Sequence, residues 1–202
     1  MTSQGPVFTD TMNSGRFWSP AGWDSTEVAP PEAEAARGSI WPVAGGHLLA
    51  RWEEKNDGDH NVWAVLDGDS GRVQASVLCD KPFAAVNGDP HSAVSPNGRY
   101  LVSGHLAFDL DGKKGYCFEE SETSKPLTFR SVTEEGTAYG TSRTRDGSVS
   151  GSAAPVVLPM DTGTPQPMGS GSAAPVADFA GVGVFEIPRP EGGGLVVHPH
   201  KD

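Results

Sequence analysis

Two cysteines are the residues of this chain whose type and spacing most readily suggest chemistry. Cys79 and Cys117 lie 38 positions apart in the 202-residue sequence. In the chain-entropy model, a disulfide that closes a loop of this size stabilises the folded state by about 3–4 kcal/mol. The alternative is a pair of free thiols, one of them partly buried as a small apolar side chain. Two isolated cysteines make a poor zinc site, because structural zinc sites prefer CxxC-type pairs, so we predict no metal there.

Aspartates gather in turns that look like partial calcium loops. They occur in the runs NDGD (56–59) and DGDSG (67–71), and at Asp109 and Asp111 beside Gly112. A complete calcium loop also supplies a later bidentate acid in a fixed ligand order, and none of these runs does. Because Asp and Gly are ordinary residues of hairpin turns, we interpret them as turn residues. If calcium binds, Asp57 and Asp59 are the better candidates, since their loop is longer and more acidic.

No motif in the chain identifies a catalytic residue or a cofactor site. His198 and His200 are two ligands without a third, which gives little metal affinity. The GxSxG, phosphate-loop and HExxH patterns are missing from the sequence. The run SGSAAPV occurs twice, at 150–156 and 170–176, and we interpret it as a repeated loop-to-strand entry. The remaining histidines fall at expected strand ends or turns, where packing or solvation explains them: His47, His60, His91 and His105.

Residues 91–120 read as one complete unit of four short strands. Pro96-Asn97-Gly98 and Asp111-Gly112 are turn signals, because proline fixes φ while Asn and Gly tolerate positive φ. The segments between them are rich in β-branched and aromatic residues, as strands are. The expected strands are 91–95, 99–104, 106–110 and 115–120. Four such strands make a small sheet that cannot bury both faces alone, so it needs neighbours.

Neighbouring stretches repeat this plan. The third expected strands end near Asp67, Leu110 and Met160, a period of roughly 40–50 residues that is typical of propeller blades. We predict an all-β fold, a β-propeller or propeller fragment of about four antiparallel four-stranded blades. The predicted blades cover about 39–79, 91–120, 127–168 and 174–200, with the last blade one strand short.

The blades resemble the propeller repeats of secreted bacterial proteins, of the WD-repeat-like and periplasmic Tol-type kind. The matching pieces are SPNGRYLVSG, LAFDLDGKKG, TEEGTAYGTS and LPMDTGTPQP. The resemblance covers roughly residues 38–200 and implies an architecture without implying a ligand. No blade has the Trp-Asp ending or Gly-His start of eukaryotic WD repeats, so that family's docking rules do not carry over. Four blades are also few, since such rings usually close with six to eight.

The first 37 residues form a predicted N-terminal extension to the propeller-like domain at 38–202. Residues 6–10 are β-prone and could supply the strand missing from the last blade. Residues 15–23 hold two of the five tryptophans and should pack against something. Residues 28–38 contain consecutive prolines and then an Ala/Glu run, which favours a linker or brief helix. Closure as a four-bladed ring and an arc of a larger ring both stay open.

Composition and charge exclude some classes of partner but say little about the function. The net charge of −11 argues against sequence-independent nucleic-acid binding and against docking on anionic lipid. No apolar run is long enough for membrane insertion. The first 18 residues lack the basic start and apolar core of a secretory signal. The family resemblance implies an extracytoplasmic location, whereas the N-terminal sequence does not support export. The localisation therefore stays open.

Three classes of function remain. We favour a non-catalytic binding or scaffold propeller that recognises a protein or small ligand through its blade loops. A sensor or regulatory region of a larger envelope-associated protein is the first alternative. A propeller enzyme, a hydrolase or lyase with acids or histidines meeting in a central channel, is the second. Trp41, Trp52 and Trp63 are expected to pack in the core, with an aromatic patch for a peptide or glycan as the other interpretation.

Overall fold

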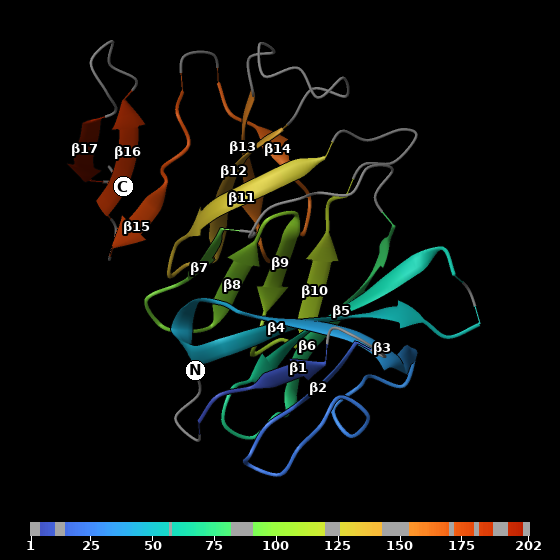
Figure 1. The fold of residues 1–202 in the computed structure, drawn as a ribbon. Coiled ribbons are helices and arrows are strands. Elements are labelled where there is room, and N and C mark those ends of the chain that lie inside the picture. Colours follow the sequence, from blue (N-terminus) through green and yellow to red (C-terminus); the bar gives the residue numbers. More distant parts are fainter. Residues whose placement is uncertain are drawn as a thin grey trace.

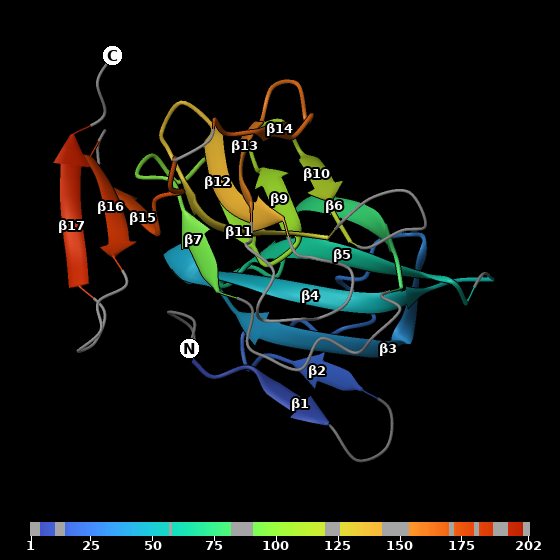
Figure 2. The same cartoon turned by 90° about the horizontal axis from the view of Figure 1, so that it is seen from above.

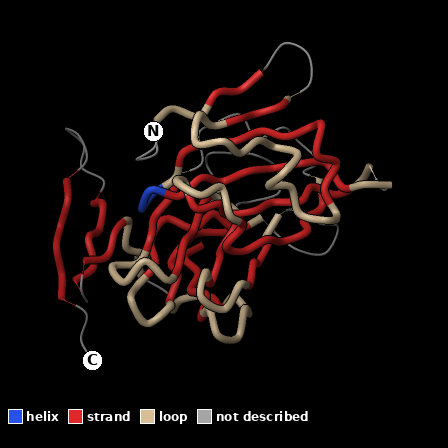
Figure 3. Tube along the Cα trace, turned by 90° about the horizontal axis from the view of Figure 1, so that it is seen from below, coloured by secondary structure: helices blue, strands red, loops and turns tan. Residues whose placement is uncertain are grey.

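The chain is a succession of antiparallel sheets that follow one another in space in the order of the sequence (Figure 1). The computed structural model describes residues 5–10, 15–56, 58–81, 91–119, 126–142, 154–169, 172–179, 182–187 and 194–199. Within them, the helical content is confined to a single 3-10 turn, η1 (Ala44–Gly46), as Figure 3 shows. None of these residues belongs to a helix with the length and apolarity needed to cross a bilayer. The all-β prediction is confirmed.

The strands group into a hairpin and four sheets. The N-terminal hairpin holds β1 (Phe8–Asp10) and β2 (Arg16–Trp18). The first sheet holds β3 (Ala33–Pro42), β4 (His47–Glu54), β5 (His60–Asp67) and β6 (Val73–Asp80). The second sheet holds β7 (Ser92–Val94), β8 (Tyr100–Ser103), β9 (Leu106–Asp109) and β10 (Lys114–Cys117). The third holds β11 (Leu127–Val132), β12 (Thr137–Ser142), β13 (Ala154–Pro159) and β14 (Gln166–Pro167), and the fourth holds β15 (Ala177–Phe179), β16 (Val182–Ile187) and β17 (Gly194–Pro199).

Each of the four sheets is a simple meander in which consecutive strands pair. The first three are four-stranded, and the fourth has three strands within the described residues. The units expected at 39–79, 91–120, 127–168 and 174–200 each contain strands of one sheet, but the first sheet begins earlier than expected, at Ala33. Short turns connect most of the strands, so each unit folds from contacts that are local in sequence.

Two expectations for the N-terminal region differ from the structure. Residues 8–10 pair with residues 16–18, with Phe8 opposite Trp18, and not with the last sheet. Strand β3 begins at Ala33, inside the stretch expected to be a linker or brief helix, so that expectation is wrong for residues 33–38. Ala33 is fully buried and lies opposite Glu54 across β4. Sheet pairing and burial thus override the helical tendency of the Ala/Glu run.

The second sheet is buried on both faces. Leu101 and Phe108 point toward the first sheet, and Tyr100 and Val102 point toward the third. Successive residues of a strand face opposite sides of the sheet, so the consecutive apolar residues Tyr100–Val102 of β8 and Leu106–Phe108 of β9 serve two interfaces. All eight residues of these two strands are buried. This explains why three apolar residues follow one another in each strand, before Ser103 and Asp109, instead of alternating with polar ones.

The outer face of the first sheet is covered by the N-terminal region. Trp52 is fully buried there and lies 5.5 Å, ring centre to ring centre, from Phe17 of β2. Phe17 also contacts Trp23, with ring centres 6.4 Å apart. The expectation that residues 15–23 pack against something is confirmed, and the surface they cover belongs to the first sheet.

The third and fourth sheets are joined next to β11. The buried Ser131 hydroxyl donates a 2.8 Å hydrogen bond to the carbonyl oxygen of Pro175, just before β15. Figures 1 and 2 show β15–β17 at one end of the series of sheets and β1–β2 at the other. The fourth sheet carries exposed apolar side chains, with Phe179 67% and Val197 61% exposed.

The first and third sheets carry equivalent turns between their third and fourth strands, and each turn packs closely against a neighbouring part of the chain. The amide of Gly71 donates to the carbonyl oxygen of Asp67, and that of Gly163 donates to Pro159, both at 2.9 Å. Both glycines have positive φ, +69° and +64°, which L side chains rarely adopt. A Cβ atom would overlap the ring of Trp23 at Gly71 and the ring of Tyr116 at Gly163. Each turn is therefore held against an aromatic ring from an earlier part of the chain.

Face-to-face packing of the second and third sheets predicts a large cost for removing Phe129, which is fully buried between them. We expect Phe129→Ala to lower the free energy of unfolding by about 3–5 kcal/mol, because it leaves a cavity. The matched control is Phe179→Ala, at a site 67% exposed, which should change it by less than about 0.5 kcal/mol. Urea denaturation measures both. Equal losses would contradict the packing described.

Candidate functional site

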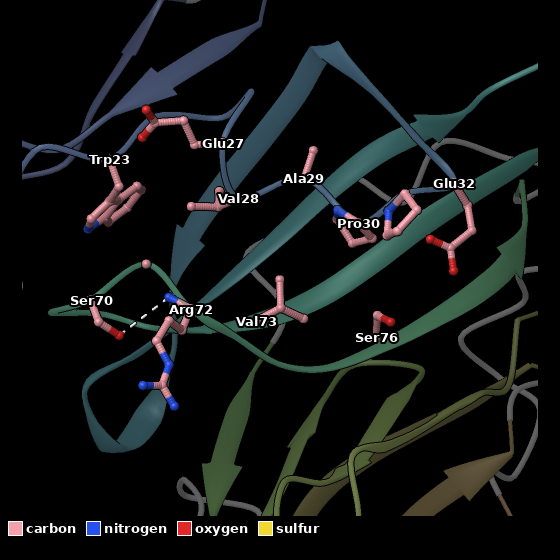
Figure 4. Close-up of a pocket in the computed structure, with 12 residues that line it drawn as sticks. Trp23, Glu27, Val28, Ala29, Pro30, Glu32, Ser70, Arg72, Val73 and Ser76 are labelled. Carbon is pink, nitrogen blue, oxygen red and sulfur yellow. Dashed lines mark hydrogen bonds between the residues drawn. The ribbon is translucent and has the colours of Figure 1, made fainter.

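The described part of the chain contains an open groove of about 510 Å³ between the N-terminal region and the first sheet (Figure 4). One wall comes from the segment 23–32, which crosses the outer face of the sheet. The other comes from the β5–β6 turn and β6. The lining residues are Trp23, Glu27, Val28, Ala29, Pro30, Pro31, Glu32, Ser70, Gly71, Arg72, Val73 and Ser76.

The N-terminal wall is shaped by prolines and by an aspartate-capped turn. Pro30 and Pro31 fix φ and lack amide hydrogens, and they enter a turn in which the Ala33 amide donates to the carbonyl oxygen of Pro30 at 2.9 Å. The carboxylate of Asp24 accepts hydrogen bonds from the amides of Thr26 (2.8 Å) and Glu27 (3.2 Å). Bonds from the Thr26 hydroxyl and amide lower the pKa of Asp24. At the far end, the Lys55 amide donates to the carbonyl oxygen of Glu32 at 2.8 Å, which ties this wall to the end of β4.

The opposite wall is held by a second aspartate. Asp67 Oδ1 accepts hydrogen bonds from the amide (2.8 Å) and the hydroxyl (2.6 Å) of Ser70. These bonds lower the pKa of Asp67, and the bond from the Ser70 hydroxyl has the larger effect. Gly71 follows and lies directly against the ring of Trp23. The Asp67–Gly71 run thus acts as a turn, and its carboxylate is used in shaping the groove.

The chemical composition of the groove suits binding. Its walls are mainly apolar, and Val73 is 40% exposed along it. Glu27 and Glu32 lie on one wall and Arg72 on the other (Figure 4). The lining includes no His, Cys or Lys; its acids are Glu27 and Glu32, and its hydroxyls are those of Ser70 and Ser76. An apolar side chain with neighbouring charge fits this composition.

The tryptophans of the first sheet separate onto its two faces. Trp52 faces the N-terminal region, whereas Trp41 and Trp63 face the second sheet. The rings of Trp41 and Trp63 stack with centres 5.7 Å apart, and the Arg51 guanidinium lies 5.5 and 5.7 Å from the two centres. Burial lowers the pKa of Arg51. This is a cation–π arrangement at the edge of an interface, and Trp63, only 9% exposed, belongs to the core.

The two cysteines meet between the first and second sheets. Cys79 on β6 and Cys117 on β10 form a disulfide with Cα atoms 5.7 Å apart. The sequence left open whether the two thiols are paired or free, and in this structure they are paired. Strands β6 and β10 are the last strands of their sheets, so the bond joins the two sheets at their edges.

His105 lies beside this disulfide. One of its ring nitrogens and the two sulfurs lie within 4.8 Å of one another. Its Nε2 atom is 3.3 Å from Oε2 of Glu119, and the indole of Trp63 meets the imidazole edge-on with ring centres 5.6 Å apart. Burial lowers the pKa of His105, while the negative charge of Glu119 opposes that effect. Among the residues that the structure describes, no other group of three Cys, His, Asp or Glu side chains is close enough to share a metal ion.

The remaining predicted residues take no part in a site that the structure shows. Asp57, one of the two calcium candidates, lies outside the described residues; Asp59 is described, and its carbonyl oxygen accepts a hydrogen bond from the Lys81 amide at 3.0 Å. His200 also lies outside them, as do residues 150–153 and 170–171 of the two SGSAAPV runs and the side chain of His198. His60 pairs with Glu54 and Asp80, at 3.0 and 3.1 Å.

Asp109 shows how the aspartate turns work. Its carboxylate accepts two hydrogen bonds from Arg99, at 3.0 and 2.9 Å, and one from the Gly112 amide at 2.9 Å. These contacts lower the pKa of Asp109, and the hydrogen bonds from Arg99 have the largest effect. The carboxylate therefore fixes the β9–β10 turn and leaves Asp111 exposed beside it.

Sequence reasoning missed the groove and the neighbour of the disulfide. Residues 28–32 fall in the stretch 28–38 that is expected to be a linker or brief helix, although Trp23 and the Pro30–Pro31 pair are signals of an ordered apolar segment. His105 was interpreted as a packed or solvated residue, and only the fold brings it to the cysteines. Comparisons with protein-family models, with curated proteins and with solved structures find no match for this chain. Its function therefore has to be inferred from its own residues.

The Asp109 contacts predict a specific acid sensitivity. The folded-state pKa lies below the unfolded value of about 3.9, so this stabilisation is complete above that value and is lost as the pH falls through the folded-state pKa. We expect Asp109→Asn to lower the melting temperature at neutral pH and to remove this part of the acid-induced loss. Asp111→Asn, on the same turn but exposed, is the control and should keep it. Melting curves recorded from neutral to acidic pH decide the matter, and parallel profiles for wild type and Asp109→Asn would refute the assignment.

Proposed function

We propose that this chain is a non-catalytic binding module with propeller-type blades, and that the groove in Figure 4 binds an extended peptide segment of a partner protein. The observation that carries the proposal is the groove itself. It is open and apolar, and prolines and Trp23 form its walls. Its volume of about 510 Å³ falls within the range of roughly 300–1,000 Å³ typical of ligand sites.

The blade interpretation is supported by repetition at three levels. Successive units are meanders, they follow one another in space, and they carry hydrogen-bonded turns at equivalent places. Turns of adjacent units also meet: the Asn97 side chain donates a 3.1 Å hydrogen bond to the carbonyl oxygen of Glu134. In a propeller, the corresponding turns of neighbouring blades lie together at one end of the ring. Both the four-bladed ring and the arc of a larger ring are compatible with these contacts.

The charge around the groove favours a particular kind of peptide. Glu27 and Glu32 are exposed on the N-terminal wall, and the chain as a whole carries a net charge of −11. A peptide with an apolar or aromatic side chain and a flanking basic residue would satisfy both the apolar walls and these carboxylates.

Of the alternatives, the enzyme has the weaker support. A propeller enzyme needs acids, histidines or a metal converging from different blades. The one convergence of three such side chains found among the described residues is Cys79, His105 and Cys117, and its sulfurs are joined to each other. A sensor or regulatory region of a larger envelope-associated protein is compatible with the same groove, because it too would act by binding.

Val73 provides the test of the groove. Peptides selected from a display library against the wild-type chain should lose at least about tenfold in affinity, about 1.4 kcal/mol, with Val73→Arg. The reason is that the long cationic side chain fills the groove and repels a basic peptide. Fluorescence polarisation with a labelled peptide measures the loss. Leu78→Arg is the matched control, on the same strand and 44% exposed against 40% for Val73, but outside the lining.

The control should bind as the wild type does. If Val73→Arg and Leu78→Arg bind the selected peptides equally well, the groove is not the binding site. If the library yields no peptide that saturates the wild-type chain, peptide binding itself is refuted. Far-UV circular dichroism of both variants shows that any loss of affinity reflects the groove and not unfolding.

A further inference from the structure

We propose that Cys79, His105 and Cys117 form a zinc site when the disulfide is reduced, so that this junction between the first and second sheets alternates between a disulfide and a bound metal. The proposal does not depend on the groove. It starts from the placement of three ligand types on separate strands or turns: the end of β6, the β8–β9 turn and the end of β10.

The distances suit a metal centre. The two sulfurs and one imidazole nitrogen lie within 4.8 Å of one another. Two Zn–S bonds of about 2.3 Å in a tetrahedral centre place the sulfurs roughly 3.8 Å apart. Reduction frees the sulfurs to separate to that spacing by side-chain rotation. The ligand set of two thiolates and one imidazole is one that zinc prefers, and a water molecule completes the tetrahedron, since the His105 side chain is 20% exposed.

The surroundings orient the imidazole. Glu119, with a side chain only 7% exposed, places Oε2 3.3 Å from His105 Nε2. A carboxylate beside a metal-binding histidine fixes its ring orientation and raises its basicity. Trp63 packs edge-on against the same ring at 5.6 Å. Glu119 and Trp63 therefore hold the His105 ring in place independently of the two cysteines.

The chemistry balances with one added reactant, a dithiol reductant. It delivers two electrons and two protons to the Cys79–Cys117 bond, which breaks to give two thiols, while the reductant becomes a cyclic disulfide. Binding of Zn²⁺ then displaces both thiol protons to solvent and forms two Zn–S bonds and one Zn–N bond. Oxidation by a disulfide-containing molecule reverses the sequence and releases the ion.

Cobalt reports on the site directly. We expect the full chain, reduced with excess dithiothreitol that is then removed without oxygen, to bind one Co²⁺ with thiolate-to-cobalt charge-transfer bands in the near ultraviolet. Added Zn²⁺ should abolish these bands and protect both thiols from a disulfide reagent. The oxidised chain should show no bands. Glu119→Gln should weaken zinc binding by about 10–100-fold, and His105→Gln by at least as much.

His91→Gln is the matched control, because His91 is exposed and outside the cluster, and it should bind as the wild type does. The proposal fails if the reduced wild type gives no charge-transfer bands, or if His105→Gln and His91→Gln bind cobalt equally well. It also fails if reduction removes the β-sheet circular dichroism signal and zinc does not restore it, since the disulfide is then required for the fold.

Discussion

The structure depends on one constraint, that a small sheet cannot cover its own apolar faces. The second sheet shows this best: Leu101 and Phe108 need the first sheet, while Tyr100 and Val102 need the third. Burial of each such side chain contributes about 1.5–3 kcal/mol, and it is available only when a neighbour is in place. The units therefore stabilise one another in series. The N-terminal region does the same for the first sheet, because Phe17 and Trp23 cover Trp52.

The features that could act on other molecules lie at the boundaries between these units. The groove forms where the segment 23–32 crosses the first sheet, and the disulfide with His105 forms where the first sheet meets the second. Neither exists within a single unit. Turn chemistry sets both boundaries: Gly71 lets the β5–β6 turn approach Trp23, and the β8–β9 turn carries His105 to the cysteines. Function at such boundaries is sensitive to the spacing of whole sheets, because their side chains come from different units.

The sequence predicts the units well because their signals are local. Pro96-Asn97-Gly98 and Asp111-Gly112 bound strands whose apolar runs are continuous, and turn preferences and strand composition act over a few residues. It predicts the boundaries poorly, since these depend on contacts far apart in the chain. The Ala/Glu run near residue 33 resembles a helix or linker by propensity, yet pairing with β4 makes it a strand. The sequence indicates the disulfide as one possibility. It gives no indication that His105, which lies between the two cysteines in the chain, would be close to them in space.

Strand β6 connects the two features physically. Val73 and Ser76 line the groove on one side of the strand, while Ala75 and Cys79 pack toward the second sheet on the other. The register irregularity between the pairs Val65–Ala75 and Leu66–Val73 is what places Val73 and Ala75, two residues apart, on opposite faces. The bond from Cys79 to Cys117 fixes the end of β6 to β10. One strand therefore supplies both a wall of the groove and one cysteine of the proposed zinc site.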